Sequence, residues 1–112
     1  GAFLRIQSGK WGRSGSNGGD VTLNVNNQTI IGDIFVDNIS TLNMKLTNGS
    51  NYTGKINGNN TAKNITLSLD STSKIKLTGD TYVTTLEDAD SSYSNINFNG
   101  YKLYVNGIAI NK

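Results

Sequence analysis

The feature that most constrains this chain is an alternation of apolar and polar residues that recurs along its length. The clearest copy is the run ITLSLDSTSKIKLTGDTYVTTL, residues 65–86. Alternation with a period of two residues is typical of a strand with one buried face. Asp70 and Gly79 stand where the alternation breaks, and aspartate and glycine both favour tight turns. The run therefore predicts short strands separated by sharp corners.

The same pattern occurs four times, so that four segments can be laid on one another. The strand-like runs are residues 21–25, 42–46, 65–69 and 96–98. The glycines that follow them, at positions 32, 54, 79 and 107, are 22, 25 and 28 residues apart. Repeats of this length are typical of solenoids, in which each coil buries its apolar face by stacking on the next. We therefore predict an all-β fold, a parallel β-helix of about four coils with almost no α-helix.

This stacking also predicts the core. One interior column is expected to hold Leu23, either Leu42 or Met44, Leu67 and Phe98. Ile31 is expected to point inward with its neighbours, and Tyr52, Tyr82 and Tyr104 to cover the ends and edges of the core.

An antiparallel sandwich with evenly spaced strands is the alternative fold. Three Asn-Gly pairs, at positions 48–49, 57–58 and 99–100, have the sequence that two-residue hairpins favour. The sequence leaves both folds open, and the four-fold repeat favours the parallel β-helix.

The composition limits the class of protein. Hydrophobic residues make up 35% of the chain and charged residues 16%, and the net charge is only +2. Disordered chains usually combine low hydrophobicity with high charge, so the strong alternation indicates a folded domain. Lys and Arg are scattered, which argues against a nucleic-acid partner. No run approaches the roughly 20 apolar residues of a membrane span.

The chain has no cysteine and no histidine. The commoner nucleophilic and metal-dependent hydrolytic sites need one or the other. Paired carboxylates alone can cleave glycosidic bonds, but most of the eight acidic residues stand at expected turns. We therefore predict that the chain is not an enzyme, with a polysaccharide lyase or hydrolase as a distant alternative.

Two small groups of residues are candidates for binding. Asp88 and Asp90 form the densest cluster of oxygen ligands, which is either a calcium-binding corner or a solvated acidic turn. We expect no other cofactor. Trp11 and Tyr101 are candidates for stacking on a sugar ring, and the alternative is that they cover the core.

The two ends of the chain differ. Phe3 and Leu4 belong to a strand-like start, where we expect an open coil end that self-associates or stacks on upstream coils. Residues 101–110 are followed by polar residues and are expected to fold over their own end. We also expect residues 1–112 to be one β-helix segment, the C-terminal coils of a longer chain.

Several motifs carry a family resemblance: GDIFVD, STL, NGSNYTG, LTGD and NGYKLYVNG. From about Trp11 to Gly107 the chain resembles the C-terminal part of secreted bacterial carbohydrate-binding proteins. These are right-handed parallel β-helices, similar in shape to pectate lyases. The resemblance implies a secreted or cell-surface protein that binds plant or microbial polysaccharide, sometimes with calcium. The expected function is a non-catalytic carbohydrate-binding or adhesive module, with a structural or assembly module as the alternative.

Overall fold

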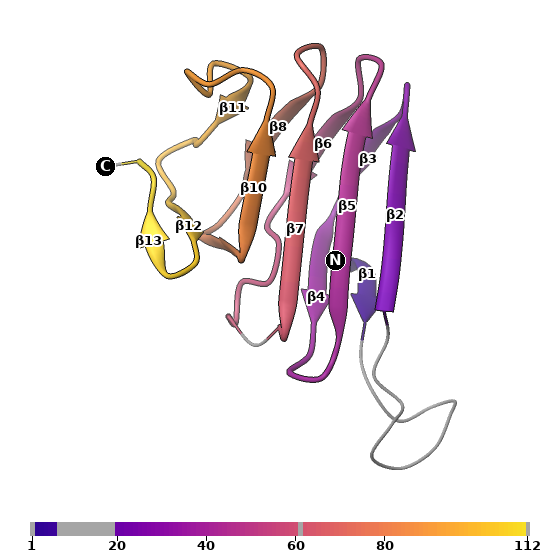
Figure 1. Ribbon diagram of the computed structural model, residues 1–112, viewed down its shortest axis with the longest axis vertical. Helices are drawn as coiled ribbons and strands as arrows, with labels where there is room; N and C mark the ends of the chain where they lie inside the picture. The colour runs from indigo at the N-terminus through magenta and orange to yellow at the C-terminus, as the bar shows by residue number, and fades with distance from the viewer. Residues whose placement is uncertain (1, 7–19, 61, 112) are drawn as a thin grey trace.

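The computed structural model describes the backbone of residues 2–6 and the whole of residues 20–60 and 62–111 (Figure 1). These residues form strands and contain no helix, so none is long and apolar enough to cross a membrane. The strands stack into a β-solenoid of about four coils. This confirms the predicted fold class and excludes the antiparallel sandwich.

One sheet, here called the front sheet, holds the first strand of each coil. Its strands are β2 (Asp20–Asn26), β5 (Thr41–Thr47), β7 (Asn64–Leu69) and β10 (Thr85–Asp88). They lie in the order β10-β7-β5-β2, and every neighbouring pair is parallel. In Figure 1 these strands all point upward, and successive coils advance from right to left. The chain returns behind them, which is the sense of a right-handed coil.

The returning segments form a second sheet, the back sheet. Its strands are β3 (Thr29–Ile31), β6 (Asn51–Gly54), β8 (Lys74–Leu77) and β11 (Ile96–Asn97). They are also parallel throughout, in the order β11-β8-β6-β3. The corner between the two sheets therefore recurs at the same place in every coil.

A third, less regular side closes each coil. Here β1 (Ala2–Ile6) pairs in parallel with β4 (Asp33–Val36), and a single parallel bridge joins Ile34 to Ile56. Further along, β12 (Leu103–Val105) pairs in parallel with β9 (Thr81–Val83). β1 and β4 form a two-stranded sheet of their own, and we call the sheet that holds β9 and β12 the side sheet.

The interior columns run along the solenoid. Leu23 lies beside Met44, Met44 beside Leu67, and Leu67 beside Leu86. Three of the predicted members are therefore in place, and the prediction for Phe98 was wrong. The front strand of the last coil is β10, and residues 96–98 belong to the back sheet. The repeat was misaligned there because Leu86 is the only apolar residue of the short strand β10.

The burial of the remaining core follows the alternation. Tyr52 is 1% exposed, so this tyrosine lies inside the core. Ile31 was expected inside but is 73% exposed, because Ile30 takes the inward position of the three-residue strand β3. The buried apolar side chains form one continuous cluster inside the coils.

The C-terminal end of the side sheet is covered by the chain itself. The last strand, β13 (Ile108–Ala109), pairs antiparallel with β12 across the turn Asn106-Gly107. Both turn residues have positive φ, 50° and 83°, as the two-residue hairpin turn requires. Residues 101–110 therefore fold over the end of the side sheet, as expected, whereas β10 and β11 have no partner on their outer edges among the described residues. Asn48-Gly49 and Asn99-Gly100 have similar φ values but form corners of the solenoid.

Candidate functional site

Asp70 stands at the corner where β7 turns toward the back sheet. Its carboxylate accepts hydrogen bonds from the backbone N–H of Asn48 at 2.9 Å and from the hydroxyl of Thr72 at 2.8 Å. The N–H groups of Thr72 and Ser73 donate to the same carboxylate, both at 3.0 Å. The Asn48 N–H, followed by the Thr72 hydroxyl, lowers the pKa of Asp70 well below its ordinary value. The charged form of Asp70 thus ties two successive corners together.

Asp90 likewise accepts several hydrogen bonds, all of them from its own turn. One carboxylate oxygen accepts from the N–H and hydroxyl of Ser92, and the other accepts from the N–H and hydroxyl of Ser94. The hydroxyls of Ser92 and then Ser94 lower the pKa of Asp90 to about 2. Both oxygens of Asp90 are therefore used by its own turn.

Asp88 points into the solenoid beside Asn95. Its Oδ1 accepts from the N–H of Asp90 at 2.9 Å and from Nδ2 of Asn95 at 3.0 Å. Its Oδ2 and the Oδ1 of Asn95 are buried without a protein partner. Two buried oxygens of this kind suit an ordered water molecule, which commonly bonds otherwise unsatisfied groups.

The hydrogen bonds of Asp88 and Asp90 bear on the predicted calcium-binding corner. Calcium takes six to eight oxygen ligands. Asp90 has no free oxygen to give, and the described residues contain no group of three acidic side chains suited to a metal ion. The geometry favours a structural role for Asp88 and Asp90, and calcium binding stays a prediction.

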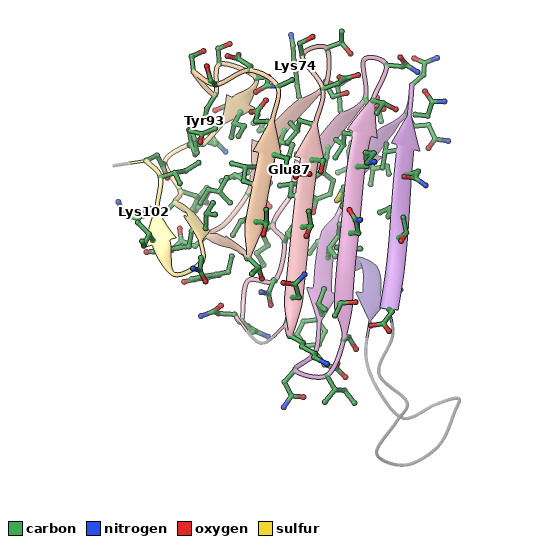
Figure 2. All side chains as sticks on the ribbon, viewed as in Figure 1. Lys74, Glu87, Tyr93 and Lys102 are labelled. Carbon is green, nitrogen blue, oxygen red and sulfur yellow. The ribbon has the colours of Figure 1, made fainter. Side chains whose placement is uncertain are left out.

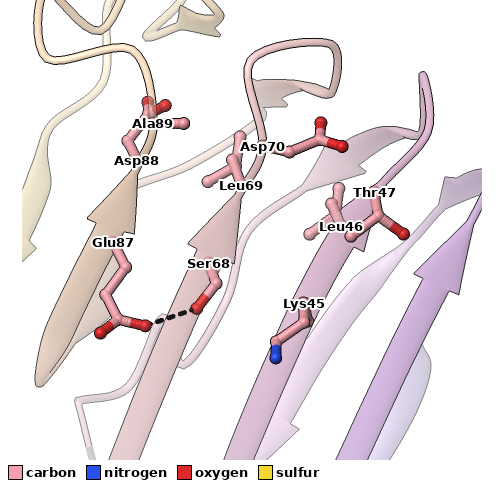
Figure 3. Close-up of a pocket in the computed structure, with 9 residues that line it drawn as sticks. All are labelled: Lys45, Leu46, Thr47, Ser68, Leu69, Asp70, Glu87, Asp88 and Ala89. Atoms are coloured by element: carbon pink, nitrogen blue, oxygen red, sulfur yellow. Dashed lines mark hydrogen bonds between the residues drawn. The ribbon is translucent and has the colours of Figure 1, made fainter.

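Two shallow grooves lie on the outer surface of the sheets. The first, the front groove, has a volume of about 470 Å³ and crosses β5, β7 and β10 (Figure 3). Lys45, Ser68 and Glu87 occupy one row across these strands, because they share a register. The Ser68 hydroxyl donates to Glu87 at 3.0 Å. Glu87 projects from the front sheet (Figure 2).

The second, the back groove, has a volume of about 320 Å³. Its lining includes Lys74, Lys76, Asn51 and Asn97 and contains no acidic side chain. Lys74 lies at the start of β8, near the upper corners in Figure 2. The two lysines alternate with buried Ile75 and Leu77, so both point outward from the same face. Neither forms an ion pair within residues 20–60 and 62–111, whose contacts the structure gives.

The lysines are flanked by amides and a hydroxyl on the neighbouring strands. Lys74 lies beside Asn51, and Lys76 lies between Thr53 and Asn97. This arrangement offers two cations and several neutral hydrogen-bonding groups over three strands. These lysines were not predicted as site residues from the sequence, although a spacing of two residues within a strand places both on one face.

The predicted aromatic residues lie elsewhere or outside the described chain. Tyr101 is 39% exposed and lines neither groove, and its carbonyl accepts from Nδ2 of Asn111 at 2.7 Å. Trp11 lies outside the described residues. Tyr82 and Tyr104 stack face to face in adjacent coils, with ring centroids 4.7 Å apart. Stacking on sugar by Trp11 or Tyr101 stays a prediction.

Comparison with known protein families, with curated proteins and with solved structures finds no match. The family resemblance therefore stays a prediction. The chain is a β-solenoid module.

Proposed function

We propose that this β-solenoid is a non-catalytic polysaccharide-binding module of a secreted or cell-surface protein, with the back groove as its binding surface. The observation that carries the proposal is that Lys74 and Lys76 lie among neutral amides, in a groove that no acidic side chain lines. Sugar hydroxyls can bond the amides of Asn51 and Asn97. Carboxylate-bearing sugars gain charge-assisted hydrogen bonds from the lysines. The proposed ligand is therefore an extended polysaccharide, with uronate polymers preferred over neutral ones.

The arrangement of the acidic residues in the front groove supports a non-catalytic function. Glycoside hydrolysis needs two carboxyl groups that face the same bond. Asp70 is held by its corner, and Asp88 points inward from a strand on which Glu87 points outward. Glu87 is thus the carboxylate of this groove that remains available to a ligand.

Assembly is the second candidate function, and the unpaired strand edges favour it. Within the described residues, β2 and β3 have no partner on the side away from β5 and β6. Such edges are templates for another strand. Phe3 and Leu4 lie on β1, which among the described strands pairs only with β4, and Leu4 is in register with Ile34. Self-association near these two residues stays a prediction.

Binding to soluble polygalacturonate and to a neutral glucan, followed by isothermal titration, tests the proposed function. Charge-assisted hydrogen bonds contribute about 1.5–3 kcal/mol each. The double variant Lys74→Ala/Lys76→Ala is therefore expected to bind polygalacturonate at least about tenfold more weakly. Lys45→Ala, which removes a lysine of the front groove instead, is the matched control and is expected to bind normally.

Two results would contradict the proposal. One is that the parent protein binds neither polymer, and the other is that the double variant binds as well as the parent. Sedimentation velocity over a range of concentrations tests the assembly alternative. If the chain assembles, its sedimenting mass should rise with concentration, and Phe3→Ser should lower that mass. A monomer at every concentration would argue against assembly.

A further inference from the structure

We propose that Asn106-Gly107 is a site of spontaneous modification, at which the asparagine cyclises and then opens to aspartate or isoaspartate. This goes beyond polysaccharide binding, since it concerns the hairpin that covers the end of the side sheet. The described residues contain four Asn-Gly pairs, at positions 48, 57, 99 and 106. Their environments differ in a way that singles out the last.

The reaction needs no cofactor. The backbone nitrogen of the glycine attacks the side-chain carbonyl carbon of the asparagine, and a new C–N bond closes a five-membered succinimide ring. The Cγ–Nδ2 bond breaks, and ammonia leaves with the proton that the backbone nitrogen has lost. Water then opens the ring at either carbonyl, giving aspartate or isoaspartate. Glycine favours the attack because it has no Cβ to obstruct the approach.

Both reacting groups of Asn48-Gly49 are held in place. Nδ2 of Asn48 donates to Oδ1 of Asn26 at 2.7 Å. The N–H of Gly49, which would have to become the nucleophile, donates to the hydroxyl of Thr72 at 2.8 Å. Rotation of the side chain and loss of the backbone proton are therefore both opposed.

The side chains of Asn57 and Asn99 are also held. Asn57 is 4% exposed, and its Nδ2 donates to the carbonyl of Tyr82 at 3.1 Å. Its Oδ1 accepts from the N–H of Ala62 at 3.2 Å. Nδ2 of Asn99 donates to the carbonyl of Leu77 at 3.1 Å. Each amide must break a hydrogen bond to a neighbouring segment before it can rotate toward its glycine.

Asn106 has no such restraint. Its backbone N–H donates to the carbonyl of Val83 at 2.9 Å, but its exposed side chain has no hydrogen bond to any described residue. The N–H of Gly107 likewise donates to no group in the described part of the chain. Apart from its two chain neighbours, no residue has an atom within 4 Å of the place where a Cβ on Gly107 would stand. The amide can therefore rotate, and the attacking nitrogen is open to solvent.

The modification would act on the cap of the side sheet. Isoaspartate routes the main chain through the former side chain and lengthens the two-residue turn by one carbon. β13 is held to β12 by only two residue pairs, Tyr104 with Ala109 and Val105 with Ile108. A longer turn cannot keep this register. Loss of β13 would uncover the outer edge of β12.

Peptide mapping of the folded protein during incubation at mildly alkaline pH tests the inference. Trypsin cleaves after lysine, so each of the four pairs falls on its own peptide: residues 46–55, 56–63, 77–102 and 103–112. The 103–112 peptide is expected to convert to aspartate and isoaspartate several times faster than the other three. In urea, where the hydrogen bonds are gone, the four rates should become similar. Hydrogen exchange of the 103–112 peptide should rise as isoaspartate accumulates.

Asn106→Gln is expected to abolish the early conversion, because glutamine closes a larger ring more slowly, and Asn99→Gln is the matched control that should leave it unchanged. Equal rates at the four pairs of the folded parent protein would overturn the proposed site, and so would faster conversion at any of the other three. Conversion at Asn106 without faster hydrogen exchange would overturn the loosening of the cap. These readouts use the parent protein and do not depend on the variants folding.

Discussion

Replacement of Leu67 by alanine is expected to be among the most damaging core substitutions in this chain. Leu67 is 1% exposed and sits between Met44 and Leu86 in the interior column of the front sheet. The change removes three carbons, worth about 2.4 kcal/mol of burial at ~0.8 kcal/mol for each. Neighbours in the coils on both sides hold the cavity open, which adds about 1–2 kcal/mol. The expected loss of unfolding free energy is therefore about 3.5–4.5 kcal/mol.

Urea unfolding followed by circular dichroism measures this loss, and thermal unfolding should show a melting temperature lower by roughly 10–20 °C. Leu86→Ala is the matched control, because Leu86 is half-buried in the outermost front strand and should cost about 1–2 kcal/mol. The reasoning would be refuted by a loss below about 1 kcal/mol for Leu67→Ala, or by an equal loss in the two variants.

Three further predictions concern backbone contact and charge. In Gly54→Ala, the new Cβ would overlap the Gly32 carbonyl and the Tyr52 hydroxyl, so urea unfolding should show that the free energy of unfolding falls by about 3 kcal/mol or more. Gly49→Ala, whose Cβ would meet open space, should lower it by about 1–2 kcal/mol. Asp70 has a lowered pKa, so its contribution to stability is present above about pH 4 and is lost as the pH falls further. In thermal scans, the melting temperature of Asp70→Asn should therefore fall less steeply below about pH 4 than that of the parent, and an equal fall would contradict this. Burial, with a smaller effect of Asp33, raises the pKa of Tyr52, so stability should fall as pH rises above about 10, and less so in Tyr52→Phe.

The fold could be predicted because the alternation is strong where the coils are complete. Residues 21–25, 42–46 and 65–69 carry three inward apolar side chains each, and they stack in the predicted register. The last coil could not be aligned in this way. Its front strand has one clear apolar residue, Leu86, and a longer corner follows it. The better-patterned run at residues 96–98 was therefore taken for the front strand, although it belongs to the back sheet.

The turns show why local signals were insufficient. Asn48-Gly49 and Asn99-Gly100 have the backbone of hairpin turns but join strands of different sheets. Asn106-Gly107, with the same dipeptide, does form a hairpin. The difference lies in what the flanking strands can pair with, which depends on the stacked coils and not on the turn itself.

The candidate site was predicted less well than the fold. Asp88 and Asp90 were singled out for their density in sequence, yet their oxygens serve mainly the turn around them. The back groove is assembled from three strands whose paired residues are 21 or 23 positions apart in sequence. Its lysines become a group only when β6, β8 and β11 lie side by side.

Cross-linking of paired cysteines tests the parallel register of the solenoid most directly, because the chain has no cysteine of its own. Thr22 lies beside Asn43, and Asn26 lies beside Thr47. Adjacent strands are about 4.8 Å apart, which is within the Cα separation of disulfides. We predict that Thr22→Cys/Asn43→Cys and Asn26→Cys/Thr47→Cys both form a disulfide on mild oxidation and that Thr22→Cys/Thr47→Cys does not. Efficient cross-linking of the 22/47 pair, with failure of the other two, would indicate antiparallel strands and contradict the fold.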